Sequence, residues 1–238
     1  MTVLSAAPVI ALAVGEYCLA VALWMLRDVG AAAAGLAAAP GIEGWRPANK
    51  PPSSRILWGL GVGVVSASTT GRCFIELLRP FGCSIVVYDP HLPEAEAERL
   101  GVRLGRIDEV CAQPLVSVHA PNLPATQGLI GAAAIAHIPD GALFVNSSRA
   151  GVVDYEALSR HLVAGRFRAA LDVFPEEPLP ASSPLYGLAN VLLTPHVAGY
   201  STDVNARMGR AVAEDVRRLA TGDPPALAVD VRRWELLA

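Results

Sequence analysis

The sequence predicts an α/β fold in which one parallel sheet is covered by helices on both faces. Apolar runs typical of strands alternate with helical patterns over residues 61–194, as they do where crossover helices join parallel strands. The predicted strands are almost continuously hydrophobic, which is expected when both faces of a sheet are buried. Residues 62–90 add a strand, a turn, a helix and a second strand, with the length and rhythm of a dinucleotide-binding unit.

The composition narrows the possible classes of function. The chain has 238 residues, of which 53% are apolar and 17% charged, so it can bury a sizeable core. Its net charge is −3 and its basic residues are scattered, which gives no footprint for nucleic acid. The four cysteines show neither a C-x-x-C pairing nor a histidine at metal spacing, so we expect reduced thiols in a cytoplasmic protein and no metal site. The expected partners are small molecules or further copies of the chain.

The first forty residues contain an apolar stretch that could be taken for a signal peptide or a membrane span. No basic segment precedes it, and Glu16 falls in the middle of the apolar run, where a carboxylate would be costly in lipid. We therefore expect a helix buried in protein and no membrane partner. Residues 40–54 are rich in proline and glycine and are expected to form a loop.

The remaining elements follow in chain order. Strands are expected within residues 61–65, 84–88, 115–119, 142–146, 168–174 and 190–194, and helices within residues 72–81, 93–100, 154–165 and 202–222. The last of these helices begins after a Ser-Thr-Asp capping signal and ends at Gly222, just before two prolines.

The turn after the first strand departs from the usual G-x-G-x-x-G pattern. Ser66 and Ser68 occupy the first two glycine positions, and Gly71 keeps the third, which lets the helix pack on the strand. The serines put a Cβ where a pyrophosphate comes close, but the helix that begins near Thr70 still offers free N–H groups to a phosphate. Asp89 closes the second strand with no arginine directly after it, which favours the ribose of NAD over that of NADP. This stretch alone leaves open a purely structural α/β unit or an S-adenosylmethionine site.

Three polar residues follow the later strands. Arg149, Glu177 and His196 each come just after a predicted strand, and the ends of parallel strands share the carboxyl edge where ligands bind. A guanidinium can hold a carboxylate through two hydrogen bonds, and a histidine beside a glutamate can give a proton to a ketone oxygen. Taken singly, each residue is typical of a surface, loop or capping position; their shared position at the strand ends predicts a catalytic set.

Several motifs together resemble one family. They are VGEYCLAVAL (14–23), YDP (88–90), VHAP (118–121), NSSRAGVVD (146–154), ALDVFPEEPLP (170–180) and LLTPHVAG (192–199). In this order, over nearly the whole chain, they are similar to the D-isomer-specific 2-hydroxyacid dehydrogenases. The resemblance implies a Rossmann-type doubly wound parallel sheet, NAD as cofactor, and interconversion of a D-2-hydroxy acid and a 2-keto acid.

The resemblance also implies a role for each site residue. Arg149 would bind the carboxylate and keto oxygen of the substrate, His196 would be the acid/base, and Glu177 would hold the imidazole and raise its pKa. Asp172 would contact the nicotinamide carboxamide, and Asp89 would bind the adenosine ribose. The full set of residues expected at the cofactor is Ser66, Ser68, Thr69, Thr70, Gly71, Asp89, Ala120, Pro121, Ser147, Ser148, Asp172 and Gly199.

The domain organisation expected from this resemblance has three parts. Residues 1–40 would form a crossover helix region, residues 55–199 the NAD-binding domain, and residues 200–238 a C-terminal helix and tail that return to the substrate domain. Members of the family begin with a substrate domain, so we expect that domain to be incomplete here. A catalytically impaired NAD-binding fragment, or a regulatory or interaction module, is the alternative to an active enzyme. The apolar helix at residues 9–26 and the family habit both favour a homodimer.

Overall fold

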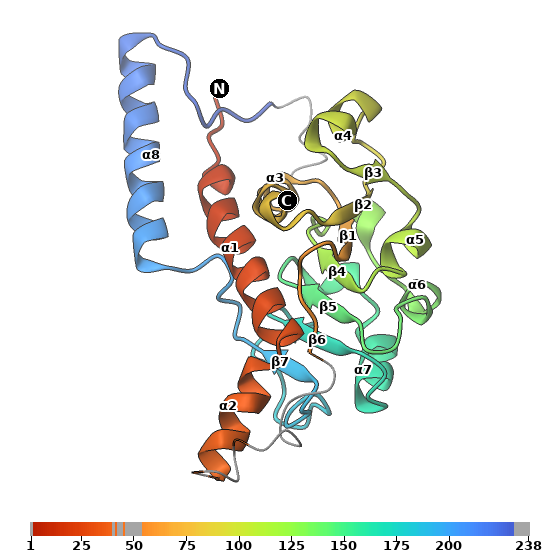
Figure 1. Ribbon diagram of the computed structural model, residues 1–238. Helices are drawn as coiled ribbons and strands as arrows, with labels where there is room; N and C mark the ends of the chain where they lie inside the picture. Colours follow the sequence, from red (N-terminus) through yellow and green to blue (C-terminus); the bar gives the residue numbers. More distant parts are fainter. Residues whose placement is uncertain (1, 40, 42–44, 46–53, 231–238) are drawn as a thin grey trace.

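Seven parallel strands form one sheet in the order β3-β2-β1-β4-β5-β6-β7 (Figure 1). The structure is a computed structural model and describes residues 2–39, 41, 45 and 54–230. The strands are β1 (Gly61–Val65), β2 (Ser84–Tyr88), β3 (Arg103–Leu104), β4 (Leu115–Val118), β5 (Leu143–Asn146), β6 (Arg168–Leu171) and β7 (Val191–Leu193). The chain order runs outward from β1 to β3 on one side and from β4 to β7 on the other, so it reverses between β1 and β4. The predicted doubly wound parallel sheet is confirmed.

Helices cover both faces of this sheet, and each face has its own apolar core (Figure 1). One face carries α1 (Ala7–Leu26), α3 (Thr69–Leu78) and α4 (Glu94–Leu100), and the other carries α5 (Ile107–Cys111), α6 (Ala132–Ala136) and α7 (Tyr155–Val163). Strand β1 supplies both cores, with Val62 and Val64 in the first and Val65 in the second. A strand buried on both sides needs apolar residues at consecutive positions, which explains the continuous hydrophobic runs.

The apolar helix near the N-terminus is α1, and it is buried along one face rather than on all sides. Cys18 and Ala22 are fully buried in the core that α1 shares with α3, whereas Leu12 and Trp24 are about half exposed. Among the described residues, α1 is the one helix long and apolar enough to span a membrane. Length and composition are weak evidence for a span, because core helices of soluble proteins share them.

Two further helices lie along the same side of the molecule as α1 (Figure 1). Helix α2 (Val29–Ala38), in an alanine-rich segment for which no element was expected, contains no buried residue. Alanine has the highest intrinsic helix propensity, which accounts for a helix that packs on little else. Helix α8 (Thr202–Thr221) is the predicted last helix, capped by the Ser201 hydroxyl, and it contacts α1.

The chain after α8 returns to the segment before α1. Leu4 and Ala228 form an antiparallel bridge, and the buried Asp215 carboxylate of α8 accepts hydrogen bonds from the N–H groups of Ala226 and Leu227. The predicted loop at residues 40–54 lies outside the described residues apart from 41, 45 and 54, and so do residues 231–238 of the predicted C-terminal part.

Candidate active site

Three adjacent pockets, together called the groove, follow the carboxyl edge of the sheet. A pocket of about 360 Å³ at the ends of β1 and β2 contains Asp89, and it shares Ser68 and Pro121 with a second pocket of about 280 Å³. The second pocket shares Arg149 with a third, of about 730 Å³, which His196 lines. The groove therefore runs from Asp89, past the turn after β1, to the residues that follow β5, β6 and β7.

The turn after β1 is tight, and α3 packs closely against it, in spite of the serines. Ser66 adopts a left-handed backbone with φ of 75°, a conformation in which glycine is the usual residue. A Cβ at Gly71 would lie 2.1 Å from the Ser66 carbonyl oxygen, so only glycine fits there, as the sequence predicted. Ser68 caps α3 by accepting a hydrogen bond from Gly71 N–H, and its hydroxyl donates to the His119 carbonyl oxygen at 2.8 Å.

Asp89 is tied to this same turn. One carboxylate oxygen accepts hydrogen bonds from the Ser66 hydroxyl at 3.1 Å and from Ala67 N–H at 2.9 Å, and the other accepts from His91 N–H at 2.9 Å. An ionised carboxylate offers about four acceptor sites, so one remains for a ribose hydroxyl. The hydrogen bonds from this turn therefore fix the orientation of the Asp89 carboxylate, the group expected to select NAD.

Ser66→Gly is expected to tighten NADH binding about fivefold, close to 1 kcal/mol, because it removes the Cβ beside the pyrophosphate path. Glycine adopts the left-handed conformation without strain, which stabilises the fold by about 1–2 kcal/mol. The lost hydrogen bond from the Ser66 hydroxyl to Asp89 and the greater backbone freedom of glycine in the unfolded chain together cost about as much. Stability should therefore change little. Calorimetric titration with NADH checks this, with Ser66→Ala as the matched control that keeps the Cβ and lacks the hydroxyl. Equal tightening in both variants would show that the Cβ does not limit binding.

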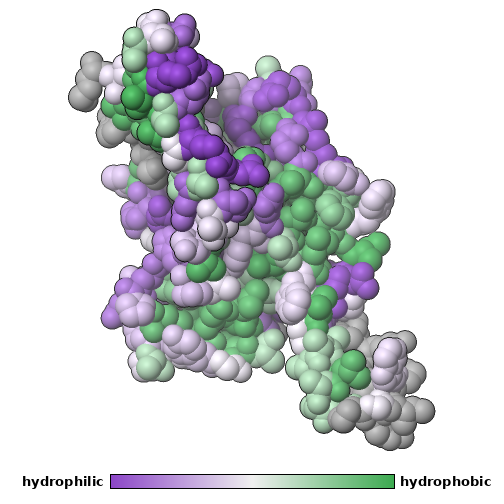
Figure 2. Space-filling model, turned by 90° about the vertical axis from the view of Figure 1, so that its left-hand side faces the viewer, coloured by the Kyte–Doolittle hydropathy of each residue, from purple (hydrophilic) through white to green (hydrophobic). Residues whose placement is uncertain are grey.

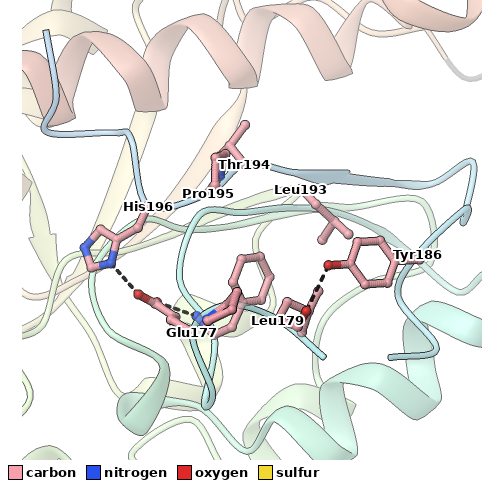
Figure 3. Close-up of a pocket in the computed structure, with 9 residues that line it drawn as sticks. Glu177, Leu179, Tyr186, Leu193, Thr194, Pro195 and His196 are labelled. Atoms are coloured by element: carbon pink, nitrogen blue, oxygen red, sulfur yellow. Dashed lines mark hydrogen bonds and ion pairs between the residues drawn. The ribbon is translucent and has the colours of Figure 1, made fainter. Parts of the chain in front are cut away.

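His196 and Glu177 form a hydrogen-bonded pair at the far end of the groove. Figure 3 shows the two side chains pointing toward each other. His196 Nδ1 lies 2.7 Å from Glu177 Oε2. The other Glu177 oxygen accepts a hydrogen bond from Phe174 N–H at 2.9 Å. Burial alone would raise the pKa of Glu177, but the hydrogen bonds from His196 and Phe174 outweigh it and leave this pKa below its usual value. Glu177 is therefore an ionised carboxylate near neutral pH. As an acceptor, it requires the facing nitrogen of His196, Nδ1, to carry a proton.

The histidine sits on a turn whose shape depends on Asp172. His196 has φ of 55°, which is strained for a residue with a side chain. The Asp172 carboxylate, fully buried, accepts hydrogen bonds from the Thr194 hydroxyl at 2.6 Å and from Val197 and Ala198 N–H at 2.9 Å. Its backbone carbonyl accepts from His196 N–H at 2.9 Å. The structure thus places Asp172 beneath the turn, and its expected contact with the nicotinamide stays a prediction.

Arg149 joins the two halves of the groove. It follows β5 at the start of a short 3₁₀-helix (Ala150–Val152), and its guanidinium donates to the Ser148 carbonyl oxygen at 2.8 Å. Its side chain borders both the pocket with Ser147 and Ser148 and the pocket with Glu177 and His196. The three polar residues that the sequence placed after separate strands therefore line one pocket.

The remaining predicted cofactor residues divide into two groups. Thr69, Thr70, Ala120, Pro121, Ser147 and Ser148 line the groove. Gly199 does not, because Ile10 of α1 fills the space beside it, at 2.9 Å from where a Cβ would be. No group of three or more histidine, cysteine or acidic side chains lies close enough to hold a metal ion in the described part of the chain.

Two residues near the groove were not among those predicted. Arg72, directly after Gly71, lines the pocket of Asp89; its place in the first turn of α3 was the available signal. The second is His119, which directly follows β4. Its ring is buried against Phe74, its Nε2 lies 2.8 Å from the Ser117 hydroxyl, and its Nδ1 has no partner among the described atoms.

Burial makes His119 a source of acid sensitivity. It lowers the pKa of His119 from 6.5 to about 3 in the folded chain, so the unfolded chain takes up the proton first. The free energy of unfolding should therefore not depend on His119 above pH 6.5, and below that pH it should fall by up to about 1.4 kcal/mol per pH unit. Urea unfolding between pH 6.5 and 5 measures this slope. His119→Asn should flatten it, whereas the exposed His137→Asn should keep it; an unchanged slope in His119→Asn would refute the assignment.

Comparison with known proteins identifies the family of the chain. Residues 19–198 match the family described as D-isomer specific 2-hydroxyacid dehydrogenase, NAD binding domain. The chain is 37% identical over 218 residues to D-3-phosphoglycerate dehydrogenase of Mycobacterium tuberculosis, covering 91% of this chain and 40% of the relative. It thus spans less than half the length of that relative.

Solved structures show the same arrangement. A phosphoglycerate oxidoreductase from Rhizobium etli superimposes with a TM-score of 0.86 at 30% identity, covering 96% of this chain and 69% of that one. A D-isomer specific 2-hydroxyacid dehydrogenase from Xanthobacter autotrophicus, in complex with NADPH and MES, superimposes with a TM-score of 0.73 at 30% identity, covering 98% and 93%.

Proposed function

Because the chain belongs to the D-isomer specific 2-hydroxyacid dehydrogenase family, we propose that it catalyses NAD-dependent interconversion of a D-2-hydroxy acid and a 2-keto acid. The observation that carries the proposal is the groove of three adjacent pockets, which begins at the carboxylate of Asp89 and ends at Arg149, Glu177 and His196. An elongated dinucleotide fits such a groove, with its ribose at one end and its reactive ring beside a proton donor.

The described residues fit a nicotinamide dinucleotide along the whole groove. Asp89 has an acceptor site left for the adenosine ribose, and the space that Gly71 leaves open brings the start of α3 to the turn. The free N–H groups and positive dipole end of α3 suit a pyrophosphate. The residues that would hold the cofactor are Ser66, Ser68, Thr69, Thr70, Asp89, Ala120, Pro121, Ser147 and Ser148. When bound, the nicotinamide supplies or accepts the hydride.

The protein's part of the reaction is orientation and proton transfer. Arg149 would hold the substrate carboxylate through two hydrogen bonds, in the pocket that Glu177 and His196 also line. In the direction of reduction, His196 gives the proton on Nε2 to the keto oxygen, and in oxidation it takes that proton back. Glu177, ionised and bonded to Nδ1, keeps the ring in one orientation.

The test is calorimetric titration with NADH, followed in the same sample by NADH oxidation with a panel of small 2-keto acids. We expect saturable binding and oxidation that depends on a keto acid. Binding without oxidation would contradict the catalytic proposal and favour an NAD-binding fragment or regulatory module. No binding would contradict the use of the groove altogether.

We also propose that the chain forms a homodimer. Apolar surface gathers on the side that carries α1, α2 and α8 (Figure 2), where the exposed side chains include Leu12, Trp24, Val29, Leu36, Val212, Val216 and Leu219. Exposed apolar side chains that gather on one side of a molecule are typical of interfaces between protein chains. Sedimentation equilibrium gives the mass directly, and a monomer at micromolar concentration would contradict the dimer.

The remaining parts of the proposal concern location and domains. Free cysteines at positions 18, 73, 83 and 111 support a cytoplasmic protein, and neither a nucleic acid nor a membrane is included among the proposed partners. We keep the division into residues 1–40, 55–199 and 200–238, in which the middle part contains all seven strands. Limited proteolysis at the two boundaries would test it.

A further inference from the structure

Arg72 is a cation inside the pocket where the adenosine ribose would bind. It lies in the first turn of α3, and it lines the same pocket of about 360 Å³ as Asp89. A guanidinium beside the ribose 2′ position is the group that accommodates the extra phosphate of NADP, whereas a carboxylate there selects NAD. The pocket therefore contains both kinds of selecting group.

Asp89 and Arg72 both form hydrogen bonds with the backbone of one residue, Ala67. Ala67 N–H donates to the Asp89 carboxylate at 2.9 Å, and the Ala67 carbonyl oxygen accepts from Arg72 Nε at 2.9 Å. The structure therefore keeps the guanidinium close to the turn and to the carboxylate without an ion pair between them. Only the remaining nitrogens of Arg72 are available to other anions.

Glu96 of α4 binds one of those nitrogens. Arg72 Nη1 forms an ion pair with Glu96 Oε1, and Arg99 holds the same carboxylate through two hydrogen bonds of 2.9 Å and 2.7 Å. The hydrogen bonds from Arg99 and Arg72 lower the pKa of Glu96 to about 2, so the group is ionised at every pH at which the chain would work. Glu96 is thus a permanent competitor for the guanidinium in the pocket.

We propose that the Arg72–Glu96 ion pair is a determinant of cofactor choice. Asp89 repels a 2′-phosphate, and Glu96 competes with that phosphate for Arg72, the guanidinium that the described residues place in this pocket. The chain therefore selects NADH. When both carboxylates are replaced by neutral amides, Arg72 is free to bind the 2′-phosphate of NADPH. The inference rests on the proposed binding of the dinucleotide in the groove.

The experiment measures dissociation constants for NADH and NADPH by calorimetry on four chains: the wild type, Asp89→Asn, the double variant Asp89→Asn/Glu96→Gln, and that double variant with Arg72→Met. NADPH affinity should rise roughly tenfold in Asp89→Asn and roughly tenfold again in the double variant, as expected for a charge-assisted hydrogen bond. Arg72→Met should remove the second gain and not the first. The matched control is the double variant Asp89→Asn/Glu98→Gln, in which an exposed carboxylate of the same helix is neutralised instead of Glu96. It should bind NADPH no better than Asp89→Asn.

Three outcomes would overturn the inference. A double variant that binds NADPH no better than Asp89→Asn would show that Glu96 does not withhold Arg72. An equal gain for NADH and NADPH would place Arg72 at the pyrophosphate, which both cofactors share. A wild type that binds neither cofactor would remove this inference together with the proposed function, whereas tight NADH binding without the second gain would remove this inference alone. Adenosine 2′,5′-bisphosphate, titrated as a fragment that carries the 2′-phosphate, should repeat the order found for NADPH.

Discussion

His196→Asn is expected to lower kcat about 10²–10⁴-fold while leaving NADH affinity within about twofold of the wild type. Asparagine cannot exchange a proton, so the step that protonates the keto oxygen is lost. The substitution suits the backbone, because asparagine is one of the few residues that adopt the left-handed conformation found here, with φ of 55°. Steady-state turnover and NADH titration on the same preparation separate the two effects.

Asp89→Ala is the matched control for this prediction. It removes the carboxylate at the other end of the groove, so it should weaken NADH binding and leave the proton-transfer step intact at saturating cofactor. The two variants should thus show opposite patterns. Similar patterns in both would contradict the separate roles of Asp89 and His196.

Asp172→Asn is expected to cost about 3 kcal/mol of unfolding free energy and to lower kcat as well. The Asp172 carboxylate accepts three hydrogen bonds from the turn of His196, and an amide can accept at only one of its two side-chain atoms. Buried N–H groups left without an acceptor cost about 1–3 kcal/mol each. Urea unfolding measures the loss of stability, and turnover below the unfolding transition measures the effect on the histidine.

The control for this variant is Asp154→Asn. Asp154 caps α7 by accepting a hydrogen bond from Ala157 N–H, and asparagine caps helices about as well as aspartate. Its stability should therefore hardly change. If Asp172→Asn weakened NADH binding without losing stability, Asp172 would act on the nicotinamide directly rather than through the turn.

Much of the fold could be predicted because the chain alternates between two clear periodicities. All six predicted strands are present, and the reversal between β1 and β4 gives the ligand edge that the strand-end residues pointed to. Three of the missed elements are short. β3 has two residues, and α5 and α6 have five each, so none of the three contains enough residues to establish a period. The fourth, α2, has ten residues but no polar side chain among them, so its sequence shows no period either.

The site could be predicted only as far as strand ends locate residues. The rule brought Arg149, Glu177 and His196 to one edge, and the structure places them around one pocket. It could not show that Asp172 faces the underside of a turn, because that depends on the path of the backbone after β6 and β7. Nor could it find Arg72, whose side chain reaches the pocket of Asp89 from the neighbouring helix.

The most direct test of the central claim is to follow a label from the cofactor to the product. NADH carrying deuterium at the transferred position of C4 would be incubated with the chain and a 2-keto acid that it reduces, and the product analysed for deuterium and configuration. The account predicts a 2-hydroxy acid with deuterium on C2 and the D configuration. A product without deuterium, a product of the L configuration, or no product with any small 2-keto acid would contradict it.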